Sequence, residues 1–464
     1  MHRPAQAPGG QPGEWHAPAA SGPVHARLRP PGSKSVTNRA LVLAALADSP
    51  TVITNPLRAR DTRLMAGALR ALGTQIDELP ESWRVTPHRP GAVEQHGGGT
   101  PGARPHGAVA VDAGNAGTVL RFVPPVAALA RSDVEFRGDA RAAQRPVGPL
   151  LAALRVLGAV IDDGGRGGVP FTVRGRGGLS GGMVTIDASA SSQLVSGLLL
   201  SAARYDKGAE VRHEGPRIPS APHIAMTVQL LRDAGADVDT GTRSGGGTGK
   251  GPSVPDFWRV HPGELRPTAV AVEPDLSNAA PFLAAALVTG GTVTVAGWPD
   301  RTTQPAAQIL EVLTRMGATA TATGEGMRVT GPGTIRGVTA DLRDVSEAVP
   351  VLTALAALAD APSEFTGIGH MRSHESDRLA ALATEIGALG GDVAEHDDGL
   401  TIQPRPLRPD GAVFASHDDH RLVMAAAVLG LALPGGLRVA GAATVAKTFP
   451  GFPAMWQAML AGSP

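Results

Sequence analysis

Five segments of this 464-residue chain share one pattern, an apolar helix that ends in glycine and continues into a short extended piece. Their leucines lie three and four residues apart, which predicts a helix with one buried face, and the glycine predicts the helix end. The residues after each glycine are predicted to form a strand. The segments are MAGALRALGTQID (65–77), LLAALRVLGAVID (150–162), VQLLRDAGADVD (228–239), ILEVLTRMGATAT (309–321) and LATEIGALGGDVAE (382–395).

A second set of six apolar segments, rich in alanine and leucine, alternates with the first set. High alanine content lets helices approach one another closely, so we expect these segments to be buried helices. Together the two sets predict duplicated α/β modules of roughly 70 to 85 residues rather than a short-period solenoid. The length of the chain favours about two to three domains. The six segments begin at Arg39, Thr118, Gln193, Asn278, Ala348 and Arg421.

The charge of the chain is balanced, because 42 basic and 42 acidic residues give a formal net charge of zero. No overall field draws the protein to nucleic acid or to an anionic membrane, so a site for an anion must concentrate its own charge. Aromatic residues make up only 3% of the chain, which leaves few side chains to stack on bases. We therefore expect neither a nucleic acid nor a membrane as partner.

The chain has no cysteine, which excludes disulfides, thiolate metal ligands and a cysteine nucleophile. Its N-terminal residues lack the apolar core of a signal peptide, and its apolar runs are interrupted before they could span a bilayer. A cytoplasmic protein is therefore predicted. Residues 1–20, rich in Pro, Gly and Ala, are predicted to be a disordered tail, and 90–107 and 241–255 are predicted to be surface loops.

A polar cluster precedes each predicted buried helix. Helix N-termini present free N–H groups and the positive end of the helix dipole, which suits anions. Ser, Thr, Asp and Asn are also ordinary N-caps, so one such cluster alone indicates only a cap. Several residues, however, add donors that a cap does not need. They are Lys34 with Arg39, the glycines of GNAGT (114–118), Ser191, Ser192, Gln193 and Arg421.

Lysine is rare in this chain: of 42 basic residues, only Lys34, Lys207, Lys250 and Lys447 are lysines. Arginine is the compositional default, so a lysine at position 34 indicates a specific role. Three more segments add charge outside the helix starts, namely AQRPVGPL with Arg145, HMRSHESDRL (370–379) and AKTFPGF with Lys447. Solvated surfaces also carry such charge runs, and HESDR alone fits a surface as well as a site.

The segment HDDH (417–420) offers two imidazoles and two carboxylates as possible metal ligands. Adjacent side chains seldom all point inward, and no further ligand set is evident, so we expect no metal site. The sequence also lacks a dinucleotide-binding fingerprint.

Seven motifs, in this order along the chain, resemble the family of 3-phosphoshikimate 1-carboxyvinyltransferase, also called EPSP synthase. The resemblance extends from about Gly32 to Phe452, and seven motifs in the right order are highly specific. The motifs are GSKSVTNRALVLAALA, GNAGTVLRF, QRPVGPL, DASASSQLVSGLLL, HESDRLAAL, DDHRLVMAAAV and VAKTFPGF.

This resemblance implies a two-domain α/β fold of the enolpyruvyltransferase type, with three βαβαββ-type repeats per domain around buried parallel helices. It implies a first domain at 32–272, a second domain at 21–31 with 273–464, and an active site in the interdomain cleft. The implied reaction transfers the enolpyruvyl group of phosphoenolpyruvate to the 5-hydroxyl of shikimate 3-phosphate and releases phosphate. It needs no metal or organic cofactor, and a monomer is expected.

Positions that match the family motifs imply roles for individual residues. Ser35 and Arg39 resemble a clamp for the shikimate carboxylate, Glu347 takes the position of the general base, and Glu375 and Lys34 are both candidates for protonating C3. The implied ligands of shikimate 3-phosphate are Lys34, Ser35, Arg39, Ser191, Ser192, Gln193, Ser220, Glu347 and His374. Those of phosphoenolpyruvate are Lys34, Asn115, Gly117, Arg145, Gln193, Arg378, Arg421 and Lys447.

Three positions depart from the family pattern. At position 374 the better-known members carry a lysine that helps to bind the 3-phosphate, and here it is His374. Because histidine titrates near neutrality, we expect the affinity for this substrate to fall as pH rises through neutrality more than in a lysine-bearing relative. Glu347 occupies a position that is often aspartate, and its side chain is longer by one methylene. Phe122 occupies a position where many relatives have proline.

Two alternatives share the expected fold. The enolpyruvyltransferase that acts on UDP-N-acetylglucosamine usually has a cysteine on a mobile loop, and this chain has none. A non-catalytic anion-binding relative is expected to lack an acid or a base, whereas Lys34, Glu347 and Glu375 are all present.

Overall fold

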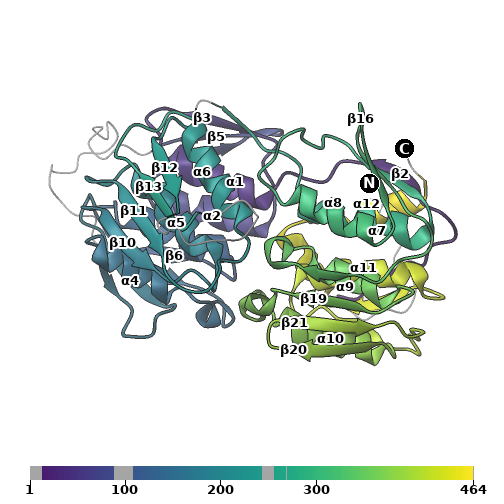
Figure 1. Cartoon of the computed structure of the whole chain (residues 1–464). Coiled ribbons are helices and arrows are strands. Elements are labelled where there is room, and N and C mark those ends of the chain that lie inside the picture. Colours follow the sequence, from purple (N-terminus) through teal and green to yellow (C-terminus); the bar gives the residue numbers. More distant parts are fainter. Residues whose placement is uncertain (1–12, 88–107, 243–254, 268, 463–464) are drawn as a thin grey trace. The chain divides into compact units, whose positions relative to one another are not determined.

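The protein is described by a computed structural model that covers residues 13–87, 108–242, 255–267 and 269–462 (Figure 1). It divides into two compact units: Pro31–Glu273, and Met1–Pro30 with Pro274–Pro464. The loop predicted at 90–107 lies outside the described residues, as does most of the one predicted at 241–255. Among the described helices, none combines the length and apolar character needed to cross a membrane.

The unit Pro31–Glu273 consists of three repeats, and its second repeat shows the common plan. Its sheet has the order β6-β7-β9-β8, in which β6 and β7 are parallel and the other neighbours are antiparallel. A helix connects the parallel strands, as such a crossover requires. The elements are β6 (Val109–Asp112), α3 (Gly117–Ala127), β7 (Asp133–Arg137), α4 (Gly148–Val156), β8 (Val160–Asp162) and β9 (Phe171–Arg174).

The other two repeats of this unit follow the same plan, with sheets ordered β10-β11-β13-β12 and β14-β3-β5-β4. One consists of β10 (Gly182–Ile186), α5 (Ser192–Ala202), β11 (Ala209–His213), α6 (Pro222–Asp233), β12 (Val238–Gly241) and β13 (Phe257–Val260). The other consists of α1 (Lys34–Ala45), β3 (Thr51–Thr54), α2 (Arg60–Ala71), β4 (Gln75–Glu78), β5 (Ser82–Thr86) and β14 (Ala269–Ala271).

The second unit repeats the plan, and the chain exchanges one strand at each crossing between units. The strand β2 (His25–Leu28) precedes α1 in sequence but pairs with β15, whereas β14 precedes α7 but pairs with β3. Besides β2, the first repeat of this unit contains α7 (Leu276–Thr289), β15 (Thr292–Val295), α8 (Ala306–Arg315), β16 (Thr319–Thr323) and β17 (Gly326–Thr330). The second repeat consists of β18 (Thr339–Asp341), α9 (Val349–Ala357), β19 (Ser363–Thr366), α10 (Arg378–Ala388), β20 (Asp392–His396) and β21 (Gly399–Gln403).

The last repeat includes a strand from the N-terminal residues 1–20, which were predicted to be a disordered tail. Within the described residues, this repeat has β22 (Val413–Ala415), α11 (His420–Ala432), β23 (Leu437–Ala440) and α12 (Phe452–Leu460), without a closing hairpin. Instead β1 (Trp15–Ala17) pairs antiparallel with β23, and the ring of Trp15 lies 5.9 Å from that of Phe452. The prediction is wrong for 13–20 because pairing and aromatic contact outweigh the local composition, and residues 1–12 lie outside the description.

The predicted helices and their glycine ends are confirmed. The outer helices α2, α4, α6, α8 and α10 are each followed by a glycine with φ between 85° and 112°, a region that disfavours other residues. The Ala-rich helices are almost entirely buried. In one unit α1, α3 and α5 pack together. In the other unit α7, α9 and α11 do so, as can be followed in Figure 1. The polar clusters therefore stand at the N-termini of buried helices.

Candidate functional site

In the unit Pro31–Glu273, two buried guanidinium groups flank the N-terminus of α3. Arg145 Nη1 donates to the backbone oxygen of Asn115 at 2.9 Å and to its Oδ1 at 3.3 Å. Arg121 Nη2 donates to Pro146 O at 2.9 Å. A Cβ on Gly117 would lie only 2.7 Å from Arg121 Nη1 and from Arg145 Nη2. The glycine therefore lets both cations approach the helix start, which is a favourable place for an anion.

Sequence reasoning missed Arg121. It found Asn115, Gly117 and Arg145, but Arg121 lies inside the apolar segment TVLRFVPPVAALA and is only 2% exposed. An arginine on a buried helix needs a specific partner or ligand, and this was the available signal. Its Nη1 also lies 3.5 Å from Oε1 of Gln193, a residue of the serine cluster described below.

Lys34 is the first residue of α1 and faces an acidic side chain from α2. Its Nζ lies 3.5 Å from Oδ2 of Asp61, a residue whose side chain is 2% exposed, against 15% for Lys34. Oδ1 of Asp61 is buried and has no hydrogen-bond partner in the described part of the chain. Asp61 was not among the predicted residues, although an aspartate beside the apolar face of α2 was visible in the sequence.

Arg39 lies one turn further along α1 and is only 1% exposed. Its Nε donates to Thr227 Oγ1 at 2.7 Å, and Nη2 donates to Ser196 Oγ at 3.2 Å and to His223 O at 3.0 Å. Nη1 donates to the backbone oxygen of Ser35 at 3.0 Å. The guanidinium is thus held firmly by protein groups, and its predicted contact with a substrate carboxylate stays a prediction.

The unusual Phe122 packs against this arginine. The guanidinium carbon of Arg39 lies 5.0 Å from the centre of the Phe122 ring, within the range of a cation–π contact. Burial lowers the pKa of Arg39 to about 9, so the group is still charged at neutral pH.

Three predicted serines lie on two segments that follow adjacent parallel strands. Ser191 is the N-cap of α5, where its Oγ accepts from the N–H of Gln193 at 3.3 Å, and Ser192 is the first residue of the helix. Ser220 lies just before α6, is 9% exposed and has a left-handed φ of 53°. The strands β10 and β11 are parallel, so both segments begin at the carboxyl ends of these strands, on the same side of the sheet.

In the other unit, Arg378 is the centre of a buried network of charges. The side chains of Arg378 and Asp419 are both 0% exposed, and Nε lies 2.8 Å from Oδ2. Nη2 lies 3.0 Å from Glu375 Oε2, and Nη1 lies 3.5 Å from Glu347 Oε2. The surrounding carboxylates raise the pKa of Arg378 above its usual value despite burial, so it is permanently charged.

Arg421 and Lys447 extend this network. Arg421 Nε donates to Glu347 Oε2 at 3.0 Å, and its Nη1 donates to Asn278 Oδ1 at 3.0 Å. Lys447 Nζ lies 3.4 Å from Glu375 Oε1, and both side chains are almost fully buried. The structure therefore brings together all the predicted charged residues of this unit. Asn278 and Asp419, recognised in the sequence only as part of the polar clusters, are two further members.

His374 has a different electrostatic state from the one expected. Its Nδ1 lies 3.1 Å from Nη1 of Arg378, and since the guanidinium can only donate, Nδ1 must accept. Burial first, and then the charges of Arg378 and the neighbouring His370, hold the pKa of His374 well below its ordinary value. The expectation that His374 titrates near neutrality is therefore wrong, since a pKa lowered in this way leaves the ring neutral at pH 7.

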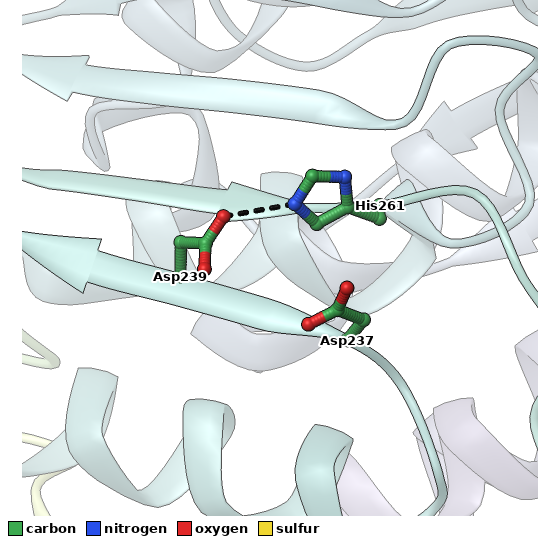
Figure 2. A group of neighbouring side chains, drawn as sticks. All are labelled: Asp237, Asp239 and His261. Carbon is green, nitrogen blue, oxygen red and sulfur yellow. Dashed lines mark hydrogen bonds and ion pairs between the residues drawn. The ribbon is translucent and has the colours of Figure 1, made fainter.

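The segment HDDH does not form a metal cluster in the structure. His417 Nε2 lies 2.7 Å from Glu385 Oε1, while Asp419 holds Arg378, so these two side chains serve separate contacts. Among the described residues, the group with metal-ligand spacing is Asp237, Asp239 and His261, whose ligand atoms lie within 4.8 Å of one another (Figure 2). His261 Nε2 already bonds Asp239 Oδ2 at 2.8 Å, and both aspartates are exposed.

Comparison with known proteins identifies the family. Residues 18–456 match the family model described as EPSP synthase (3-phosphoshikimate 1-carboxyvinyltransferase). The chain belongs to the EPSP synthase family. A protein of Mycobacterium ulcerans named 3-phosphoshikimate 1-carboxyvinyltransferase is 49% identical, with 97% of this chain and 98% of that protein covered. One of the same name from Kocuria rhizophila is 48% identical, with 97% of each covered.

Solved structures confirm the predicted enolpyruvyltransferase-like fold. An EPSP synthase from Acinetobacter baumannii is similar with a TM-score of 0.73 at 25% identity, covering 95% of this chain and 96% of that one. The enolpyruvyl transferase NikO from Streptomyces tendae has a TM-score of 0.70 at 19% identity, covering 97% and 98%, and supports the fold alone. The family model and the relatives named 3-phosphoshikimate 1-carboxyvinyltransferase favour an EPSP synthase over the two alternatives considered from the sequence.

Proposed function

We propose that this EPSP synthase family member transfers the enolpyruvyl group of phosphoenolpyruvate to the 5-hydroxyl of shikimate 3-phosphate and releases phosphate. Family membership and relatives of that name at 48–49% identity support this function. The observation that carries it is the concentration of buried cationic groups in a chain without net charge. Both substrates are anions, and buried arginines bind carboxylate and phosphate groups strongly because water does not screen them.

Phosphoenolpyruvate is the proposed ligand of the guanidinium cluster at α3 and of the Arg378 network. The first supplies Arg145, Asn115, Gln193 and the backbone at Gly117, and the second supplies Arg378, Arg421 and Lys447. Lys34 is proposed to contact both substrates. The remaining proposed ligands of shikimate 3-phosphate are Ser35, Arg39, Ser191, Ser192, Gln193, Ser220, Glu347 and His374.

The proposed reaction is an addition followed by an elimination. The 5-hydroxyl loses its proton and its oxygen bonds to C2 of phosphoenolpyruvate, while C3 gains a proton. The intermediate then loses a proton from C3 and expels phosphate, which restores the double bond. Glu347 is the proposed base, and Arg421 and Arg378 hold its Oε2 at 3.0 and 3.5 Å. Lys34 and Glu375 are the candidates for the proton at C3.

Release of phosphate from phosphoenolpyruvate tests the function. We expect release with shikimate 3-phosphate as acceptor and none with UDP-N-acetylglucosamine. Release only with the nucleotide sugar would instead establish the alternative transferase. Binding of both proposed substrates without any release, measured by calorimetry, would establish a non-catalytic relative. A cytoplasmic location, a monomeric state and independence of cofactors remain predictions.

Gly117→Ala is expected to raise KM for phosphoenolpyruvate by at least about tenfold, the factor that corresponds to ~1.4 kcal/mol of binding. The added Cβ would stand 2.7 Å from Arg121 Nη1 and from Arg145 Nη2, so both guanidinium groups must move. Steady-state kinetics with each substrate varied measures this change. The matched control is Gly67→Ala on α2, where a Cβ meets nothing within 4 Å. Equal KM values for Gly117→Ala and Gly67→Ala would contradict the proposed site.

The pH dependence of shikimate 3-phosphate binding tests the role of His374. Because the lowered pKa keeps this ring neutral at and above pH 7, we expect His374→Gln, which cannot titrate, to show the same pH profile from pH 7 to 9 as the unaltered protein. Calorimetry with the substrate provides the measurement. If affinity falls across this range only in the unaltered protein, the bound phosphate protonates His374 and the neutral form is not the one that binds.

A further inference from the structure

Two segments that carry the predicted serines follow neighbouring parallel strands, and these two strands end at paired residues. Ile186 ends β10 and His213 ends β11, and these two residues are partners in the parallel register. Segment 187–191 then leads to Ser191 and Ser192 at the start of α5, and segment 214–221 leads past Ser220 to α6. The distance between the two groups of hydroxyls therefore depends on what connects the two segments near the strand ends.

His213 makes such a connection through both nitrogens of its ring. The N–H of Ala188, in the first segment, donates to Nδ1 at 3.2 Å. Nδ1 also lies 3.3 Å from the carbonyl oxygen of Ile186. Because a carbonyl oxygen can only accept, Nε2 carries a proton and donates to the carbonyl oxygen of Pro216, in the second segment, at 2.8 Å. The residue is 9% exposed, so water has little access to replace these bonds.

The connection reaches the first group of serines through one further residue. The carbonyl oxygen of Ala188 accepts from the N–H of Ser191 at 3.0 Å, so the residue whose N–H bonds His213 also bonds the N-cap of α5 through its carbonyl group. On the other side, the left-handed φ of 53° at Ser220 requires that the surrounding segment keep its shape, because that conformation is costly for a residue other than glycine.

We propose that His213 is a positioning residue that fixes the spacing of Ser191 and Ser192 relative to Ser220, and thereby the affinity for the phosphate group of shikimate 3-phosphate. This inference rests on the proposed role of the three serines as phosphate ligands. His213 itself does not contact the substrate. Phosphate is a compact tetrahedral ligand, so donors on two segments bind it well only if their separation is set before it arrives.

Substitutions of His213 that keep one, or neither, of the two bonds test the proposal. His213→Leu removes both bonds, and we expect KM for shikimate 3-phosphate to rise about tenfold, which corresponds to ~1.4 kcal/mol, while KM for phosphoenolpyruvate and kcat change less than about twofold. His213→Asn keeps an acceptor near Nδ1 and His213→Gln keeps a donor near Nε2, so both variants should show intermediate values of KM.

A matched control is available in the same sheet. His261 follows β13, which runs antiparallel to β11 with Val260 opposite Ala209, so His261 lies at the other end of the sheet from His213. His261→Asn is expected to leave both KM values unchanged. The proposal is overturned if His213→Leu leaves KM for shikimate 3-phosphate unchanged. It is also overturned if both KM values change equally along with the melting temperature, since that result indicates a general structural role.

Ser192→Ala in the same assay separates this inference from the function on which it rests. If Ser192→Ala raises KM for shikimate 3-phosphate and the His213 variants do not, only the positioning role fails. If Ser192→Ala has no effect either, the proposed phosphate site fails as well. Should His213→Leu not fold, the Asn and Gln variants decide, and values of KM equal to those of the unaltered protein in both would refute the proposal.

Discussion

Asp419→Ala is expected to lower the free energy of unfolding by about 3 to 5 kcal/mol, the usual result of leaving one member of a buried ion pair without its partner. Oδ2 of Asp419 lies 2.8 Å from Nε of Arg378, and neither side chain is exposed. The same carboxylate accepts from Ser376 Oγ at 3.2 Å and from the N–H of Arg421 at 2.9 Å, where it caps α11. Urea denaturation measures the change.

Asp392→Ala is the matched control for this substitution. Its carboxylate also pairs with an arginine, Arg405, at 3.2 Å, but these side chains are 46% and 61% exposed. Exposed pairs contribute about 0 to 1 kcal/mol, so this variant should unfold at nearly the same urea concentration as the unaltered protein. If the two variants lose similar stability, the Arg378 network is not the buried ion cluster described above.

The repeats were predictable because their signals are local. A stripe of leucines and a glycine at the helix end depend only on neighbours within a few turns, and the glycines after α2, α4, α6, α8 and α10 all take the expected left-handed conformation. The polar clusters at the helix starts were predictable for the same reason. Ser191, Asp275 and Asp419 each accept a hydrogen bond from a backbone N–H in the first turn of their helix.

Features that depend on distant pairing were not predictable in this way. β1 is ordered because β23, more than 400 residues later, offers it an edge, with Trp15 opposite Val439. Asp61 belongs to the site because the fold brings it to Lys34, and Arg121 because the fold brings it to Pro146 and Gln193. No periodic pattern marks such contacts, and a single polar residue in an apolar segment was the only available signal.

The protonation state of His374 was likewise not predictable from the sequence. The substitution of lysine by histidine was visible in the sequence, and an isolated imidazole titrates near neutrality. Its state in the protein depends on burial and on Arg378, one turn away on the next helix, whose guanidinium donates to Nδ1. The sequence showed both residues, but not that the arginine faces the ring. The direction of the pKa shift therefore followed only from the structure.

Lys34→Ala is expected to lower kcat/KM by about 10² to 10⁴, the usual range for loss of a proton-transfer group. Nζ of Lys34 lies 3.5 Å from the buried carboxylate of Asp61, which holds the ammonium at the start of α1. Lys207→Ala is the matched control, because Lys207 is an exposed lysine that belongs neither to the guanidinium pair at α3 nor to the Arg378 network. Steady-state kinetics should show no change for Lys207→Ala.

Lys34→Arg distinguishes the two roles that the ammonium group can have. Arginine keeps the positive charge but releases protons poorly and is bulkier. If Lys34 delivers the proton to C3, Lys34→Arg should lose nearly as much kcat as Lys34→Ala, while substrate binding, measured by calorimetry, is better retained. Turnover equal to that of the unaltered protein would show that Lys34 is only an electrostatic contact. Glu375, held 3.4 Å from Lys447 in the other unit, would then be the remaining candidate for protonating C3.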